Sequence, residues 1–285
     1  MINFIITVSL FNILFLIFHN KISEIINIYD LPNKVRKFHK KKTPITGGIL
    51  VYSNLLIYVF FYFNDKDIVN FFLDNENKFF LFFLTCSLIF LVGIIDDKRN
   101  LSPNLKLFLL ILIISPSIIL NNDLIISSVR LSFFENEFGL KNFSIFWTIL
   151  CMLLFVNAVN MFDGINLQLT LYFFFQLIII YLFASFDPFL FSLLIFLIVF
   201  FVLNFNSKSF LGDSGSLLIA YIFGCLFISL YNKSSINSDQ IVLIMLIPGI
   251  ELIRLFTSRI LQRKNPFKPD RNHLHHKLIK KIIFI

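Results

Sequence analysis

The chain has 285 residues, of which 57% are hydrophobic and 15% charged, and it contains 40 Phe. Ordinary globular domains carry about 25% charged residues and far less apolar surface, so this composition excludes a soluble globular protein. The net charge of +8 comes from basic residues placed between apolar runs, and no nucleic acid is expected as a partner. The three cysteines lie within apolar runs and form no C-x-x-C pair, which indicates neither a disulfide nor a metal site.

Apolar runs recur along the whole chain. A membrane-spanning helix needs about 20 apolar residues, with about 17 as a minimum. The sequence therefore predicts an all-α polytopic membrane protein, a single domain over residues 1–285 with about nine to ten transmembrane helices. The predicted spans are 3–20, 46–63, 78–95, 105–120, 144–160, 167–184, 187–204, 215–231 and 240–260. The first run lacks a preceding basic stretch and a small-residue cleavage site, so we interpret it as a helix and not as a signal peptide.

The segment between the fourth and fifth spans, residues 121–143, is a long polar insertion. Residues 124–134 within it are rich in β-forming residues and predict a small hairpin, which would be periplasmic in the orientation derived next.

Basic residues are distributed unequally between the two sides. Of the 25 Lys and Arg, 20 fall in or beside segments that follow odd-numbered spans, when Lys106, Arg254 and Arg259 near the ends of the adjoining spans are included. Basic residues that flank spans stay in the cytoplasm, so these segments are predicted to be cytosolic and the N-terminus to lie outside. We expect a multi-pass protein of a bacterial inner (plasma) membrane with its active site facing the cytoplasm.

Unusual polar clusters fall on the same predicted cytosolic side. They comprise, in chain order, Lys37, His39 and Gly48; Asp96 and Asp97; Asn157, Asn160 and Asp163; Asp213; and Asp270, Arg271, His273, His275 and His276. For an acidic pair after an apolar run, a helix cap or a solvated turn is the common explanation. Asp163 is harder to explain in that way, because its segment is too short to leave the membrane surface and ionisable groups there are costly.

Converging aspartates with Asn160 match what a hard cation needs. Mg²⁺ takes one or two carboxylates and completes its octahedron with water and substrate phosphates. The three C-terminal histidines could suggest zinc, but no thiolate or second ligand cluster accompanies them, and beside Arg271 they favour a phosphate clamp. Glu251 and Arg254 lie one turn apart and predict a structural ion pair. The residues alone thus indicate a membrane-embedded, Mg²⁺-competent, phosphate-binding site.

The order D-x-P-x-x-x-RK-x-H, TP-x-x-GG, DD, NAVNMFDG, GDSGS and PF-x-PDR-x-HLHH spans residues 30–278. It resembles the polyprenyl-phosphate N-acetylhexosamine-1-phosphate transferases, the WecA/MraY-type enzymes of glycosyltransferase family 4, and its last motif is similar to the WecA-like branch. The resemblance implies transfer of a sugar-1-phosphate, such as N-acetylglucosamine-1-phosphate, from a UDP-sugar to undecaprenyl phosphate with release of UMP. Such a product would start a lipid-linked glycan for a cell-envelope polysaccharide such as a lipopolysaccharide O-antigen.

The resemblance also implies residue roles. Asp213 and Asn160 would bind Mg²⁺, with Mn²⁺ as an alternative, and Asp96, Asp97 and Asp163 are the candidate catalytic carboxylates. The substrate-binding candidates are Lys37, His39, Gly48, Asn157, Asp270, Arg271, His273, His275 and His276. The expected partners are a UDP-sugar, undecaprenyl phosphate and membrane lipids, and a homodimer remains open.

This chain departs from the family pattern at two places. Relatives often read DG-x-DG where this chain has Asp163-Gly164-Ile165-Asn166-Leu167. The second carboxylate and the second glycine of that pattern are absent, which favours Asp163 over position 166 as the base of this segment. The chain also ends at Ile285, so it is expected to lack the last helix of the family. The alternatives are a polyprenol-sugar transporter or flippase, an inactive relative and, within the family, a phospho-MurNAc-pentapeptide transferase. The sequence names neither the sugar nor the polysaccharide pathway.

Overall fold

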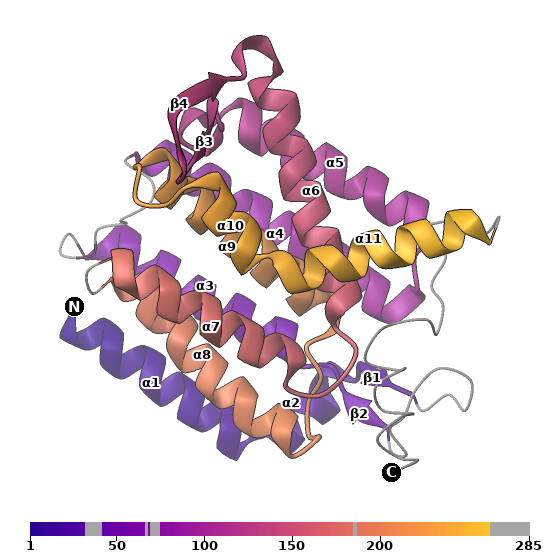
Figure 1. The fold of residues 1–285 in the computed structure, drawn as a ribbon. Coiled ribbons are helices and arrows are strands. Elements are labelled where there is room, and N and C mark those ends of the chain that lie inside the picture. The colour runs from indigo at the N-terminus through magenta and orange to yellow at the C-terminus, as the bar shows by residue number, and fades with distance from the viewer. Residues whose placement is uncertain (32–41, 66–67, 69–74, 185–186, 263–285) are drawn as a thin grey trace.

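A computed structural model describes residues 1–31, 42–65, 68, 75–184 and 187–262 (Figure 1). Helices dominate, with two short antiparallel strand pairs. The helices are α1 Ile2–Ile17, α2 His19–Ile26, α3 Gly47–Asn64, α4 Glu76–Arg99, α5 Pro103–Ile119, α6 Ser144–Phe162, α7 Gln168–Phe183, α8 Pro188–Phe205, α9 Gly212–Asn232, α10 Ser238–Ile244 and α11 Leu246–Leu261. The strands are β1 Tyr29–Asp30, β2 Thr43–Pro44, β3 Ser128–Leu131 and β4 Phe134–Gly139.

Each of the nine predicted spans contains a helix, which confirms the all-α membrane fold. Within the described residues, five helices are long and apolar enough to cross a membrane: α3, α4, α6 with the turn before it, α8 and α9. The bent pairs α1–α2 and α10–α11 bring that number to seven if each is one span. Helices α5 and α7 are apolar but shorter, with 17 and 16 residues.

Side-chain caps set where several helices begin. The Asn75 side chain accepts a hydrogen bond from the Asn77 N–H at the start of α4, and Ser102 does the same for Leu105 in α5. Asp187 accepts from the Phe189 N–H at 2.7 Å, directly before Pro188 of α8. Such caps satisfy N–H groups that have no partner within the helix, which matters more where lipid replaces water.

The last predicted span is broken, with an angle of 74° between α10 and α11. Pro248 explains the position of the break, because a proline ring clashes with the carbonyl of the residue four positions earlier. That residue is Ile244, the last of α10. Its carbonyl accepts a hydrogen bond from the Tyr172 hydroxyl of α7 at 3.4 Å, so a neighbouring helix supplies the missing donor.

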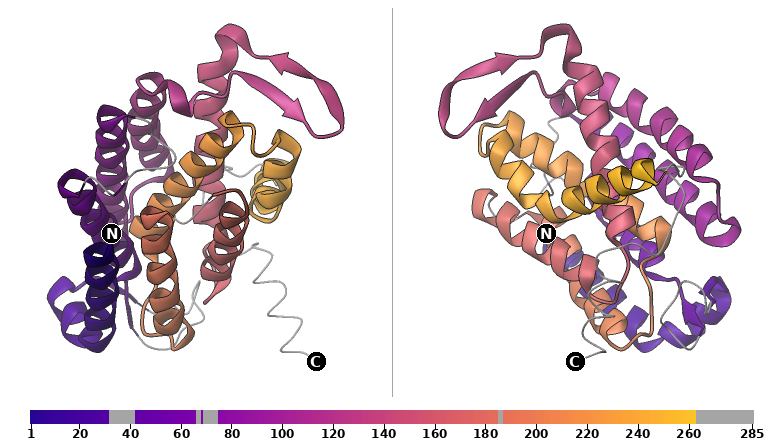
Figure 2. Two further views of the ribbon diagram at one scale, coloured as in Figure 1. Left: turned by 90° about the vertical axis from the view of Figure 1, so that its left-hand side faces the viewer. Right: turned by 45° about the vertical axis from the view of Figure 1, so that its right-hand side comes forward.

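The predicted hairpin exists, but it lies a few residues later than expected, at 128–139. Residues 122–124 form a short 3₁₀ turn that Asn121 caps, so the extended segment starts only after them. Arg130 and Tyr231 connect the hairpin to the C-terminal end of α9. Figure 2 shows the hairpin running across the ends of the helices.

Helix α9 forms the centre of the bundle, with Ser214–Tyr231 buried throughout. It packs against α3, α4 and α6. Its N-terminal turn approaches α3 and α4 closely, because both present glycines there. A Cβ added at Gly48 would clash with the Ser214 hydroxyl and lie 2.6 Å from the Gly215 nitrogen, and one at Gly93 would lie 2.6 Å from the Ser214 nitrogen. This close packing brings the ends of four helices together around Asp213.

Candidate active site

Lys106 lies at the centre of a polar cluster, although its segment is otherwise apolar. Its Nζ is 2.8 Å from Asp96 Oδ2 of α4 and 2.6 Å from Asp213 Oδ1 of α9. It also donates to Asn160 Oδ1 of α6 at 2.9 Å. The Lys106 and Asp96 side chains are 12% and 8% exposed, whereas Asp213 is 34% exposed. We call Asp96, Lys106, Asn160 and Asp213 the Lys106 cluster.

Asn160 orients Asp213. Its Nδ2 donates to Asp213 Oδ1, and also to the Ser216 hydroxyl at 2.8 Å, while its Oδ1 accepts from Lys106. Both ends of the amide are therefore engaged, which gives the Asp213 carboxylate a fixed direction. Asn157, one turn earlier on α6, donates to the Leu153 carbonyl in its own helix and not to the Lys106 cluster.

Asp97 binds the N-terminus of α9. Its Oδ1 accepts from the Asp213 N–H at 2.7 Å, and its Oδ2 accepts from the Ser214 N–H at 3.1 Å and the Ser214 hydroxyl at 2.6 Å. A carboxylate here satisfies unpaired N–H groups and interacts favourably with the helix dipole. Gly212 makes this approach possible, since it has φ +74° and a Cβ there would lie 2.8 Å from Asp97 Oδ2. Asp97 therefore holds the backbone that carries Asp213.

The segment before α3 runs beside the segment before α9. The Gly47 and Gly48 N–H groups donate to the Phe210 and Leu211 carbonyls at 3.1 and 3.0 Å. The Thr46 and Ser209 hydroxyls are 2.6 Å apart, and His19 Nε2 is 3.0 Å from Thr46 Oγ1. The bonds of Thr46, Gly47 and Gly48 join parts of the chain that are more than 150 residues apart. Gly48 thus sits against the α9 N-terminus, where its lack of a side chain is required.

Asp163 follows the last residue of α6 and lies outside that helix. Desolvation by the surrounding protein, together with the negative charges of Asp213 and Asp97, raises the pKa of Asp163 to about 7. Solvent still reaches the residue, so its protonation can follow the pH of the medium. A carboxyl group with a pKa near neutrality is suited to accept or release a proton.

A family profile described as glycosyl transferase family 4 matches residues 79–231, more than half of the chain. The chain belongs to glycosyl transferase family 4. The matched region includes Asp97, Asp163 and the whole Lys106 cluster.

Curated relatives in this family cover nearly the whole chain. It is 27% identical to the undecaprenyl-phosphate alpha-N-acetylglucosaminyl 1-phosphate transferase of Escherichia coli O157:H7, over 97% of this chain and 76% of the relative. It is 28% identical to the protein of the same name from Yersinia pestis over the same shares, and 28% identical to that of Thermotoga maritima over 89% of this chain and 73% of the relative.

The oxygen atoms of this family-4 site suit a hard cation. Among the described residues, no three His, Cys, Asp or Glu side chains gather closely enough to hold a metal by themselves. Mg²⁺ needs only one or two carboxylates when water and substrate phosphates complete its octahedron. Asp213 is accessible to solvent and fits that role, with Asp163 as the second nearby carboxylate. Asn160 donates to Asp213 and its own oxygen accepts from Lys106, and its role as a metal ligand stays a prediction.

Lys106 is not among the site residues that the polar clusters predict, and in the sequence it contributes only to the distribution of basic residues. It stands, however, in the apolar run LKLFLLILII. An ionisable residue inside such a run is by itself a reason to expect a functional site, and that signal could have identified it.

Several predicted substrate-binding residues lie outside the described residues. They are Lys37 and His39 in 32–41, and Asp270, Arg271, His273, His275 and His276 in 263–285.

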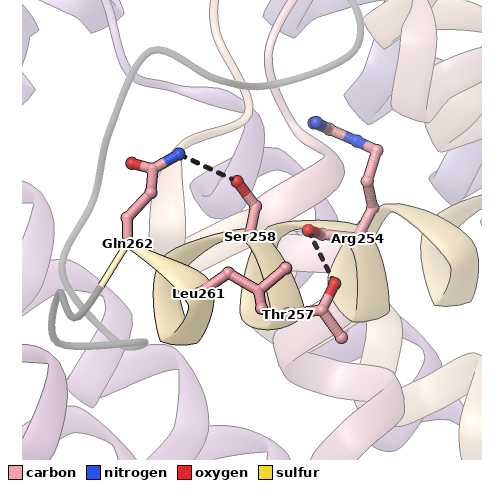
Figure 3. A pocket seen from close by; sticks show the side chains of 5 residues that line it. All are labelled: Arg254, Thr257, Ser258, Leu261 and Gln262. Atoms are coloured by element: carbon pink, nitrogen blue, oxygen red, sulfur yellow. Dashed lines mark hydrogen bonds between the residues drawn. The ribbon is translucent and has the colours of Figure 1, made fainter.

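The predicted Glu251–Arg254 ion pair is confirmed, with two N–O distances of 2.9 Å. A separate pocket on α11 is lined by Arg254, Thr257, Ser258, Leu261 and Gln262, and Figure 3 shows Gln262 donating to the Ser258 hydroxyl there.

Proposed function

We propose that this chain transfers N-acetylglucosamine-1-phosphate, or a related N-acetylhexosamine-1-phosphate, from a UDP-sugar to undecaprenyl phosphate and releases UMP. The relatives named above are transferases of this kind. The observation that carries the proposal is the Lys106 cluster, in which charged groups from α4, α5 and α9 and an amide from α6 meet at one end of the bundle. Scaffolds of apolar helices rarely contain such groups unless they take part in function.

The reaction joins two anions. An oxygen of the lipid phosphate forms a bond to the sugar-linked phosphorus, and the bond from that phosphorus to the bridging oxygen of UMP breaks, so that UMP leaves with the bridging oxygen. Because phosphoryl transfer depends mainly on positioning and charge neutralisation, the protein must bring cationic groups to the diphosphate. We infer that the Lys106 ammonium, 2.6 Å from Asp213 Oδ1, is one of these groups.

Mg²⁺, or Mn²⁺ in its place, would be held by Asp213 with Asp163 nearby and would neutralise charge on the diphosphate. Asp163, with a pKa of about 7, can hold or take up a proton at its carboxylate as the lipid phosphate approaches. Asp96 is paired with Lys106 and sets the position of its ammonium. Asp97 is a positioning residue, because it contacts the backbone of Asp213 and Ser214.

We further propose that the site faces the cytoplasm of a bacterial inner membrane, with the N-terminus outside. The distribution of basic residues along the sequence supports this orientation, since 20 of 25 Lys and Arg fall in or beside segments that follow odd-numbered predicted spans, and the aspartates of the site fall in the same segments. A product made there would start a lipid-linked glycan for the cell envelope.

The direct test is UMP release by the purified protein with undecaprenyl phosphate, Mg²⁺ and a panel of UDP-N-acetylhexosamines. We expect release with at least one sugar donor and none without the lipid phosphate. Asp213→Asn should abolish release, whereas Asp123→Asn, which alters a carboxylate at the opposite end of α9, should retain it. Folded, monodisperse protein that releases no UMP with any donor would overturn the proposal.

A further inference from the structure

The β3–β4 hairpin has one apolar face and one polar face. Val129 pairs with Phe138 and Leu131 with Phe134, and residues paired across two strands project to the same side. The Phe134 and Phe138 rings stack with their centroids 5.4 Å apart. The register shifts between these two pairs. On the other side, Glu137 accepts from the Ser128 hydroxyl at 2.7 Å and lies 3.9 Å from Arg130, and Glu135 alternates with Phe134 along β4.

Polar groups attach the hairpin to the helices beneath it. The Arg130 guanidinium lies 4.4 Å from the centroid of the Tyr231 ring, near the end of α9. The Tyr231 hydroxyl donates to the Ser128 carbonyl at 2.7 Å. At the turn, the Ser132 N–H donates to Asp239 of α10 at 2.8 Å. These bonds fix the hairpin and leave its phenylalanines outside the contact.

The phenylalanines are unusually exposed for a folded hairpin. Phe133 in the turn is 77% exposed, Phe134 is 46% and Phe138 is 52%. Two further exposed rings, Phe143 and Phe146, follow where α6 begins, and their centroids are 5.0 Å apart. Exposed aromatic residues therefore continue along the chain from the hairpin to the start of α6, a helix that can cross the membrane.

The position of the hairpin indicates what covers this surface. It lies where α9 ends and α6 begins, so it is level with the boundary of the membrane, at the end of α9 opposite Asp213. In both views of Figure 2 it runs across the helix axes, and its turn projects beyond the neighbouring helices. A segment that extends sideways past the bundle at this level lies over lipid.

We propose that Phe133, Phe134 and Phe138 insert into the headgroup region of the bilayer and anchor the hairpin there. Aromatic rings are favoured at the boundary between lipid and water, where apolar and polar surroundings meet. Glu135 and Glu137, on the other face, remain in water, because moving a carboxylate toward lipid is costly. Through Ser132 and Asp239 the anchor also holds the start of α10 at the membrane surface.

Single-tryptophan fluorescence tests this insertion. Trp147 is the only tryptophan of the chain, so Trp147→Phe provides a silent background. Phe133→Trp and Phe138→Trp then report on the apolar side, and Glu135→Trp is the matched control on the polar side of the same strand pair. Each protein is placed in nanodiscs of phosphatidylethanolamine and phosphatidylglycerol that carry bromine atoms either near the carbonyl groups or near the chain ends.

We expect the Phe133→Trp and Phe138→Trp reporters to be quenched severalfold more by the shallow bromines than the Glu135→Trp reporter. Acrylamide, a quencher in water, should show the reverse order. Equal acrylamide quenching of all three reporters would overturn the proposal, because the face would then be in water. Protection from both quenchers would also overturn it and would indicate a protein surface, such as a second copy of the chain. Having two reporters keeps the test decisive if one variant fails to fold.

Discussion

Removing the Lys106 ammonium is the perturbation that the structure predicts to be most costly. Nζ lies within 2.8 Å of both Asp96 and Asp213, and the Lys106 side chain is only 12% exposed. Lys106→Met keeps most of the side-chain volume but leaves two carboxylates without their cation. Removing one partner of a buried ion pair costs about 3–5 kcal/mol. Since Asp213 is 34% exposed, we expect the lower end of that range, about 3 kcal/mol.

The matched control is Lys78→Met. Lys78 and Asp123 form an ion pair at 2.7 Å, and their side chains are 29% and 27% exposed, against 12% and 8% for Lys106 and Asp96. Water reaches both partners, and ion pairs near the surface contribute about 0–1 kcal/mol, so this variant should unfold nearly like the native protein. The comparison therefore sets a lysine buried between two carboxylates against a more exposed lysine with one carboxylate partner.

Denaturant unfolding in a fixed detergent measures both variants, and UMP release measures activity. Lys106→Met should be destabilised and inactive, and Lys78→Met should be neither. Adding Asp96→Asn to Lys106→Met should restore part of the stability, because it removes one unpaired charge. If Lys106→Met and Lys78→Met unfolded alike, the lysine would not be paired with the carboxylates and the reasoning would be wrong.

Three further outcomes are expected. Because the pKa of Asp163 is raised to about 7, the fraction of Asp163 in the carboxylate form increases as the pH rises through 7. The rate of UMP release should rise over the same interval, and Asp163→Asn should remove that pH dependence. Gly48→Ala should lower the free energy of unfolding by about 1–3 kcal/mol, because the new methyl group pushes α3 away from the turn at Ser214. Gly249→Ala is the control, since nothing lies within 4 Å of its new Cβ, and equal unfolding midpoints for the two variants would contradict the expectation. Asp97→Ala should lower stability by about 1–2 kcal/mol through loss of the α9 cap, and full stability would argue that the cap is not formed.

The helices were predictable because the membrane imposes a simple rule. A segment that crosses lipid must be apolar over about 20 residues and must satisfy its own backbone, so the runs in the sequence mark the helices. The break after Ile244 was harder to place. Pro248 is visible within its run, but a proline can either bend or interrupt a helix. The Tyr172 hydroxyl, which donates to the Ile244 carbonyl at the break, lies on a different helix, α7.

The different contacts of Asp96 and Asp97 could not be predicted from the sequence pattern. They are adjacent in the sequence and were predicted to share a catalytic role, which remains a prediction. Neighbouring residues on a helix point in different directions, about 100° apart, so they reach different partners. Asp96 pairs with Lys106, and Asp97 binds the N-terminus of α9. A helix cap was the alternative explanation for this acidic pair, and the helix that is capped turns out to start more than 100 residues later in the chain.

The membrane class, the order of the helices and the polar segments that carry charge can be predicted from the sequence, because they depend on the composition of each local stretch. Which charges meet depends on how the helices pack. Lys106, a single lysine in an apolar run, becomes the centre of the cluster because glycines let α3 and α4 approach α9 and bring Asp213 to Asp96. Distances between helices depend on packing across the whole bundle, and local composition does not encode them.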